Sequence, residues 1–328
     1  MRLEDLGFGS AQSEALGERG IARERCGRVV RAERGQVVVL AEGGERALII
    51  PGSLKAPELA PTTGDWVVAS ERGAVEAVLP RTSVFRRRAA GLRTEAQVVA
   101  ANVDVAFVLT GLDGDFNLRR IERYLTLVGE SGARAVVLLT KAGGCAPRDE
   151  RVSQAKAVAP GADVHAIDVV DGIAEDAPLA YLGPGVTAAV LGSSGVGKST
   201  LVNHLMGRGV AKTNEVRERD DRGKHTTTRR ELFVLPGGGA IIDTPGMREL
   251  AVWGDAGSLE ASFPDVVELS AACRFRDCRH RAEPGCEVRA AIGRGALTEA
   301  RLASYSSLAA EIAATERARV EKARKKRR

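Results

Sequence analysis

The chain has 328 residues, of which 44% are hydrophobic and 28% charged, so we expect two or three domains with sizeable cores and exclude a disordered protein. No stretch approaches the roughly 18 apolar residues of a membrane-spanning helix, and the N-terminus lacks the pattern of a signal peptide, so we expect a cytoplasmic protein without a membrane partner. Five cysteines are too few for a disulfide scaffold.

The formal net charge of +5 is concentrated at the C-terminus. Residues 316–328 hold eight Lys or Arg and two Glu, a net charge of +6, whereas the other 315 residues hold 40 basic and 41 acidic side chains. A basic run at a chain end is either a solvated tail or a contact with nucleic acid. The charge pattern alone leaves both interpretations open.

The N-terminal part predicts about five short strands. Glycine and proline separate runs rich in β-branched residues, at 28–30, 36–40, 47–50, 65–69 and 74–79. This number and spacing of strands favour a small β-barrel such as an OB-fold, with a small β-sandwich as the alternative.

From Asn102 onward the pattern predicts alternating strands and helices. A strand over 103–110 precedes a helix from about Leu118, and another apolar strand follows over 135–139. Such alternation, which continues to about residue 253, indicates an α/β domain with a parallel sheet. We expect domain boundaries at 1–80, 81–253 with its connector, and 254–328, the last segment containing a cysteine cluster, helices and the basic tail.

A phosphate-binding loop follows the predicted strand 187–191. Glycines let the backbone N–H groups converge on phosphate oxygens, and the N-terminus of the next helix adds partial positive charge. Lys198 is expected to reach the β- and γ-phosphates. The pattern G-x-x-x-x-G-K-[ST] predicts nucleotide binding by Gly192, Ser193, Ser194, Gly195, Val196, Gly197, Lys198, Ser199 and Thr200.

Two later segments complete the predicted triphosphate site. Asp243 follows the apolar strand 240–242 and, with the Ser199 hydroxyl, is expected to hold Mg²⁺, while the Gly246 N–H contacts the γ-phosphate. Between the phosphate loop and Asp243 lies the polar run Gly223-Lys224-His225-Thr226-Thr227-Thr228. It fits a switch loop in which Thr226 and Thr227 contact the nucleotide.

A cluster near the C-terminus predicts a metal site. Three thiols and one imidazole fall within 14 residues, at Cys273, Cys278, His280 and Cys286. This is the ligand set of a closed, structural Zn²⁺ site, which leaves no open position for catalysis. The metal would stabilise a segment too rich in loops to build its own core.

Together these motifs resemble the circularly permuted GTPases of the ribosome small-subunit-dependent GTPase A (RsgA/YjeQ) family. Further matching stretches are Gly64-Asp65-Trp66-Val67, residues 98–104 and Phe116-Asn117-Leu118. The segment that resembles the guanine-reading motif, with Thr140 and Lys141 as nucleotide-binding residues, precedes the phosphate loop, whereas ordinary GTPases place it after.

The resemblance implies a multidomain fold, with an N-terminal OB-fold β-barrel, a central circularly permuted P-loop GTPase domain and a C-terminal zinc-binding helical domain. It also implies binding of GTP and GDP, a role in late maturation of the small ribosomal subunit, and that subunit's rRNA as partner. We expect a monomer that contacts RNA through backbone charge, using Arg86, Arg87, Arg88 and the basic tail.

The sequence departs from the family at the guanine-reading motif. Gly143 stands where N/T-K-x-D has the Asp that accepts the N1–H and N2–H₂ groups of guanine. Losing this charge-assisted pair costs roughly 1.5–3 kcal/mol of base discrimination. Either a displaced acid such as Asp168 replaces it, or the base specificity is relaxed.

The position that orients water in Ras-like enzymes is also altered. Met247 stands where those enzymes have a Gln, so we expect slow hydrolysis without the subunit and take His225 as the candidate catalytic residue. The alternative roles for His225 are a contact with rRNA or a purely structural role in shaping the loop. The alternative function for the chain is an RNA-binding assembly factor with a degenerate or base-unspecific nucleotide site.

Overall fold

The structure is a computed structural model that describes residues 2–88, 96–207, 231–243 and 256–326. The predicted switch-loop run 223–228, with His225, Thr226 and Thr227, lies outside the described residues, as do Gly246 and Met247. Within the described ranges, no helix is both long enough and apolar enough to cross a membrane.

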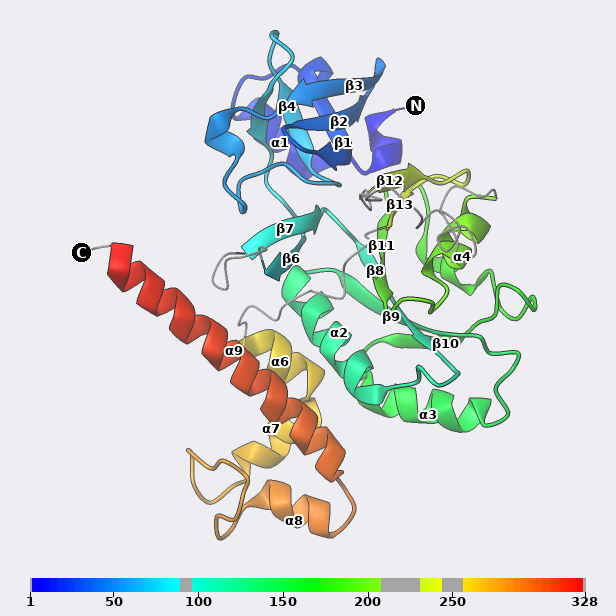
Figure 1. The fold of residues 1–328 in the computed structure, drawn as a ribbon, viewed down its shortest axis with the longest axis vertical. Coiled ribbons are helices and arrows are strands. Elements are labelled where there is room, and N and C mark those ends of the chain that lie inside the picture. Colours follow the sequence, from blue (N-terminus) through cyan, green and yellow to red (C-terminus); the bar gives the residue numbers. More distant parts are fainter. Residues whose placement is uncertain (1, 89–95, 208–230, 244–255, 327–328) are drawn as a thin grey trace, which may run out of the picture.

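The N-terminal part is a closed five-stranded barrel (Figure 1). Antiparallel pairing gives the order β3-β2-β1-β4-β5, and a parallel bridge between Ile49 and Ala74 joins the two outer strands. This is the strand order of an OB-fold, so the predicted barrel is confirmed. The strands are β1 (Cys26–Glu33), β2 (Gln36–Ala41), β3 (Gly44–Ile49), β4 (Trp66–Ala69) and β5 (Val75–Val78).

A segment before the barrel covers one end of it. It contains η1 (Leu3–Leu6), α1 (Ser10–Gly17) and η2 (Arg23–Arg25). Phe8 packs edge-on against Trp66 with ring centroids 5.3 Å apart, inside a cluster that also buries Leu3 and Leu6. A further 3-10 turn, η3 (Gly52–Leu54), follows β3.

The predicted connector is a β-hairpin. Strands β6 (Val84–Arg88) and β7 (Ala96–Ala101) pair antiparallel and form a sheet of their own. Figure 1 shows this hairpin between the barrel and the central sheet.

The central sheet has the order β10-β9-β8-β11-β13-β12. All neighbouring pairs are parallel except β12 and β13, and β12 also pairs with barrel strand β1 at Arg31 and Glu231. The chain runs outward from β8 to β10 and then returns to β11 on the other side of β8. The strands are β8 (Val105–Gly111), β9 (Arg134–Thr140), β10 (Asp163–Ala166), β11 (Thr187–Gly192), β12 (Glu231–Val234) and β13 (Ala240–Asp243).

Helices cover both faces of this sheet, which explains its continuous apolar strands. In β8, Ala106 and Val108 pack on the side of α2 (Leu118–Ser131) and α3 (Arg148–Val158). The alternate residues Phe107 and Leu109 pack in the cluster of α4 (Lys198–Leu205). Helix α2 begins at the predicted residue because the Asn117 side chain accepts the Arg120 N–H at 3.1 Å and caps it. The turn η4 (Ala177–Tyr181) precedes β11.

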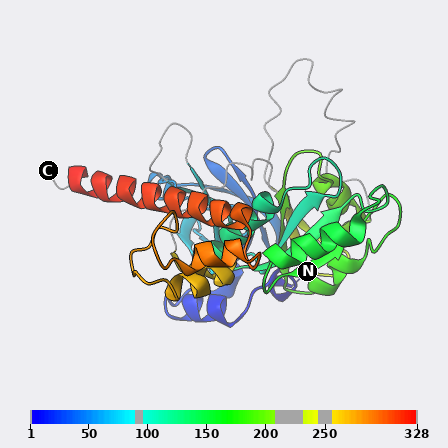
Figure 2. The ribbon, with the colours of Figure 1, turned by 90° about the horizontal axis from the view of Figure 1, so that it is seen from below.

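The C-terminal part is helical and packs on α2. It contains α6 (Ala256–Ser262), α7 (Pro264–Ala271), α8 (Glu287–Gly293) and α9 (Glu299–Lys326), and both α6 and α9 contact α2. Leu302, Leu308 and Ile312 of α9 are buried and belong to the main hydrophobic core. Helix α9 continues through residues 316–326, so most of the basic tail is helical and extends away from the body (Figures 1 and 2).

A fully buried arginine joins the barrel to the central sheet. The Arg28 guanidinium donates to the backbone carbonyls of Leu6, Gly64 and Asn102, the last at 2.8 Å. Burial lowers the pKa of Arg28 to about 10, so it remains charged at neutral pH. Gly64 has a φ of 91°, and a Cβ there would meet the Ala101 carbonyl at 2.1 Å. Two of the stretches that matched the family therefore meet at this junction.

Replacing Arg28 by Met should destabilise the protein by at least about 2 kcal/mol, because three buried carbonyls each lose a donor and, among the described residues, only that of Gly64 keeps a second one, the Asn102 side-chain amide. The free energy of unfolding from urea denaturation measures this. The control is Arg72→Met, at an exposed arginine between β4 and β5. Equal unfolding free energies for the two variants would contradict the role assigned to Arg28.

Candidate functional site

The phosphate loop lies at the carboxyl end of β11, as its sequence predicts. It leads from Gly192 into α4, which begins at Lys198. Gly192, Gly195 and Gly197 have φ angles of 150°, 73° and 99°, a region that favours glycine, and a Cβ on Gly192 would meet the Leu109 carbonyl at 2.7 Å. The Lys198 ammonium folds back on the loop, donating to the carbonyls of Gly192, at 2.9 Å, and Ser193.

A cavity of about 190 Å³ adjoins this loop. One wall consists of residues 195–201, from the loop and the first turn of α4. The opposite wall contains Thr140 and Lys141, which follow β9, and residues 167–170, which follow β10. Carboxyl ends of three parallel strands therefore meet around one cavity, the usual ligand position in an open α/β sheet.

A buried hydrogen bond ties the two walls together. The Thr140 hydroxyl donates to the Val196 carbonyl at 2.7 Å. Next to it, Lys141 adopts a φ of 60° and its ammonium donates to the Asp113 carboxylate at 2.7 Å. This hydrogen bond holds the pKa of Asp113 below its ordinary value. The structure therefore brings the predicted base-side residues, Thr140 and Lys141, against the predicted phosphate loop.

The two described residues predicted for Mg²⁺ lie at the same edge of the sheet. Ser199 is in the first turn of α4, and Asp243 is the last residue of β13. Because β13 pairs with β11 and sets Asp243 beside Val190, the end of β13 lies close to Gly192, where the phosphate loop begins. One hydroxyl and one carboxylate beside a phosphate-binding loop are oxygen ligands that suit Mg²⁺.

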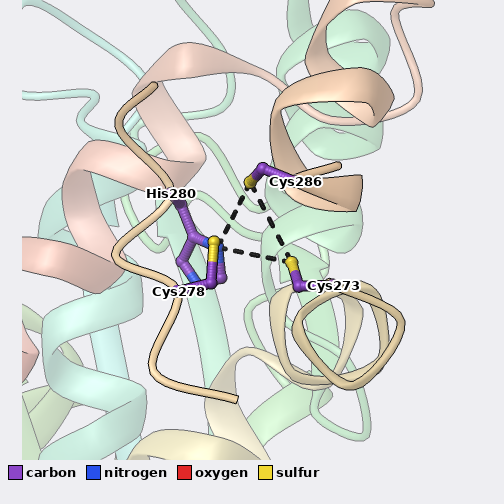
Figure 3. A group of neighbouring side chains, drawn as sticks. All are labelled: Cys273, Cys278, His280 and Cys286. Atoms are coloured by element: carbon purple, nitrogen blue, oxygen red, sulfur yellow. Dashed lines mark hydrogen bonds between the residues drawn. The ribbon is translucent and has the colours of Figure 1, made fainter. Parts of the chain in front are cut away.

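The cysteine cluster is assembled in space. Ligand atoms of Cys273, Cys278, His280 and Cys286 all lie within 4.8 Å of one another, and Figure 3 shows the four side chains converging. His280 Nδ1 is 3.7 Å from Cys273 Sγ and 3.5 Å from Cys286 Sγ, and these two sulfurs are 3.9 Å apart. Tetrahedral zinc, with Zn–S about 2.3 Å and Zn–N about 2.0 Å, separates its ligands by about 3.5–3.8 Å. The cluster therefore fits zinc.

Neighbouring groups orient this cluster. The Ser270 hydroxyl lies 3.1 Å from His280 Nε2, which leaves Nδ1 facing the sulfurs. Burial lowers the pKa of His280, which favours the neutral imidazole that a metal requires. Cys286 caps α8, where its sulfur accepts the Arg289 N–H at 3.4 Å.

Some residues at the nucleotide cavity were not singled out from the sequence. Ile167 and Val170 line it, and the Ser193 hydroxyl of the phosphate loop donates to Asp115. Val170 is apolar but 82% exposed. The exposure of an apolar side chain beside a cavity can be seen only in the structure, so the sequence offers no signal for Val170. Asp115 lies in the loop after β8, and only the pairing of β8 with β11 places it beside Ser193.

The fold and this cavity define a P-loop nucleotide-binding protein in which the base-side segment precedes the phosphate loop along the chain. The sequence model of a family described as RsgA GTPase matches residues 78–253. The chain is 52% identical over 254 residues to the small ribosomal subunit biogenesis GTPase RsgA of Xylella fastidiosa, covering 76% of this chain and 73% of that protein. The chain belongs to the RsgA GTPase family.

Other relatives agree with this. Identity to small ribosomal subunit biogenesis GTPase RsgA 2 of Lactiplantibacillus plantarum is 40% over 294 residues, 87% of this chain and 83% of that protein. YjeQ from Thermotoga maritima is similar in structure, with a TM-score of 0.62 and 24% identity over 88% of this chain and 98% of that chain. YloQ, described as a circularly permuted GTPase, gives a TM-score of 0.57 at the same identity, over 88% and 94%. The fold and circular permutation predicted from the sequence are confirmed.

Replacing Thr140 by Val should destabilise the protein by about 1–3 kcal/mol and weaken nucleotide binding, because the buried Val196 carbonyl loses its donor. Thr110→Val on neighbouring β8 is the matched control. The Thr110 hydroxyl is buried and has no hydrogen-bond partner within the described residues, so its loss should cost little. Urea denaturation and calorimetric titration with GDP measure both effects. A larger loss for the Thr110 variant would contradict this role of Thr140.

Proposed function

We propose that the chain binds GTP with Mg²⁺, hydrolyses it to GDP and phosphate, and acts in this way on the small ribosomal subunit during its late maturation. One observation carries this proposal, the cavity at the carboxyl edge of the sheet between the phosphate loop and Thr140–Lys141. The printed names of the relatives supply the partner, since they are small ribosomal subunit biogenesis GTPases. The site of action is then the cytoplasm, with the chain acting as a monomer.

In this proposal the phosphate loop, residues 192–200, cradles the phosphates and Lys198 neutralises their charge. Lys198 would exchange its bonds to loop carbonyls for bonds to phosphate oxygens. Ser199 and Asp243 would hold Mg²⁺, and that ion would supply positive charge beside the phosphates. Thr140 and Lys141 contact the base side of the nucleotide.

Residues whose roles are assigned from the sequence alone complete the proposed site for the triphosphate. Thr226, Thr227 and the Gly246 N–H are assigned to the γ-phosphate side, and His225 is assigned to the attacking water. An imidazole can accept a hydrogen bond from water, which the thioether of Met247 does only weakly. Binding of the subunit would then organise this switch and raise the hydrolysis rate.

RNA contact is assigned to charge rather than to base stacking, because aromatic residues make up only 4% of the chain. Arg86 and Arg87 lie on β6, next to the barrel, and Arg86 is exposed. Arg317 and Arg324 lie in the last turns of α9, and both are exposed. The helical form of this tail supports its use as a contact surface, since it holds basic side chains in fixed directions.

Phosphate release from GTP and from ATP, with and without purified small subunits, tests the proposal. We expect slow release alone and a marked stimulation of GTP hydrolysis by the subunit. No stimulation with either nucleotide would overturn the enzymatic function and favour the RNA-binding assembly factor.

Replacing His225 by Ala should lower the subunit-stimulated rate by about 100-fold or more, because the attacking water loses its hydrogen-bond partner. Affinity for GTP should stay unchanged, since binding depends on the phosphate loop. Single-turnover hydrolysis and calorimetric titration separate the two quantities. Unchanged stimulated turnover would remove His225 from the mechanism and leave it the contact with rRNA or the structural role in the loop.

We also propose that Cys273, Cys278, His280 and Cys286 hold one structural zinc ion. Cys278→Ser should reduce the zinc content from one ion per chain to nearly none and lower the melting temperature, because three ligands hold the metal weakly. Cys145→Ser, outside the cluster, is the control and should keep its zinc. Elemental analysis after dialysis measures the content, and a full zinc complement in the Cys278 variant would contradict the assignment.

A further inference from the structure

The space next to Gly143 is filled by an acid from another part of the chain. A Cβ at residue 143 would lie 1.9 Å from the Asp171 carboxylate oxygen Oδ2 and 2.9 Å from Asp171 Cγ. A side chain at residue 143 and the Asp171 carboxylate in this position therefore exclude each other. Residue 143 has no carboxylate of its own. The Asp171 carboxylate occupies the space where a side chain at residue 143 would begin.

A short turn holds Asp171 in this place. The Asp168 carboxylate accepts the N–H groups of Val170 at 3.0 Å and Asp171 at 3.2 Å through Oδ1, and that of Gly143 at 3.1 Å through Oδ2. Asp168 also exchanges two backbone hydrogen bonds with Ile173, at 2.7 and 2.8 Å. Because both Asp168 oxygens are used by backbone N–H groups, Asp168 fixes the turn against residue 143 and is poorly placed to bind a base.

The Asp171 carboxylate, unlike that of Asp168, is not used by backbone N–H groups within the part of the chain that the structure describes. Asp171 is exposed, and among the described residues no group hydrogen-bonds to its carboxylate. The three residues that precede Asp171 line the nucleotide cavity together with Lys141, on the wall opposite the phosphate loop. A ligand whose phosphates lie on the loop would place its base toward this wall.

We propose that Asp171 supplies the carboxylate that selects guanine in this chain. The inference rests on the proposed binding of GTP and identifies the residue that decides its base specificity. A carboxylate accepts hydrogen bonds from the N1–H and N2–H₂ groups of guanine, whereas adenine has an acceptor at N1 and no amino group at C2. Gly143 is then the small residue that leaves room for Asp171.

The test replaces Asp171 by Asn and measures calorimetric affinities for GDP, ADP and xanthosine diphosphate with Mg²⁺ present. The wild-type chain should prefer GDP over ADP by about 10- to 100-fold. The Asn amide can accept from N1–H and donate to the C2 carbonyl of xanthine, so D171N should lose about 10-fold or more for GDP and gain affinity for the xanthine nucleotide. Glu175→Gln, the same change in the same loop, should leave all three affinities unchanged.

A second pair of variants tests the geometry. Asp171→Gly should lose guanine preference, and combining it with Gly143→Asp should restore it, because the new carboxylate enters the space that Asp171 vacates. Circular dichroism checks that the variants fold. Restored guanine preference would support the proposal independently of the xanthine result. If Asp171 had only a structural role, a carboxylate placed at residue 143 would not restore the preference.

The outcomes distinguish this proposal from the function on which it rests. A wild-type chain that binds no nucleotide would overturn both. Equal wild-type binding of GDP and ADP would overturn the Asp171 assignment and leave nucleotide hydrolysis in place. Unchanged guanine preference in D171N, with loss of that preference in Asp168→Asn, would overturn the assignment in favour of Asp168.

Discussion

The placement of β11 between β8 and β13 is the constraint on which the site depends. Parallel hydrogen bonding on both sides fixes where β11 ends, and therefore where the phosphate loop begins relative to Asp243 and to the segment after β9. The start of β11 is fixed as well, because the Asp104 carboxylate accepts the Thr187 N–H at 2.7 Å and the Asp104 N–H donates to the Thr187 carbonyl. Because β11 is hydrogen-bonded along its length, the glycine loop that follows it can present its N–H groups in one direction.

The other two parts of the molecule attach to the central α/β part through buried arginines. Arg28 brings together carbonyls of the N-terminal segment, of the barrel and of Asn102, the residue that follows β7. In the C-terminal part, Arg301 of α9 donates to Glu122 of α2 at 2.7 Å and to Asp265 of α7, and the side chains of Arg301 and Glu122 are only 6% and 3% exposed. A guanidinium has five donors in a fixed plane, so it can satisfy several acceptors from different elements at once. Displacing one part would leave buried polar groups unpaired, which favours a single arrangement of the three parts.

Much of the fold followed from local signals. The five barrel strands, the helix from about Leu118, the phosphate loop and the spacing of the cysteine cluster each depend on a few neighbouring residues, and the structure agrees with all of them. The hairpin β6–β7, the pairing of β12 with both β13 and β1, and the helical course of the tail were not predicted. The pairing of β12 with β1 joins segments 200 residues apart, Arg31 and Glu231, which no local pattern reveals. The hairpin strands β6 and β7 lie close together in the chain, but the segment was interpreted only as a connector. The tail was interpreted from its charge alone, although its residue types tolerate a helix.

The sequence by itself determined the class of site, because phosphate binding requires a glycine loop followed by Lys198 and because four zinc ligands at short spacing identify a metal centre. It also showed that Gly143 stands where the family has an acid. Two interpretations remained open, namely that Asp168 replaces the acid or that the base specificity is relaxed. Only the tertiary structure decided that Asp168 is used by backbone N–H groups and that Asp171 fills the space beside Gly143. The physical reason is that these residues are 25 and 28 positions from Gly143, and the pairing of β9 with β10 is what brings the loops that follow them together.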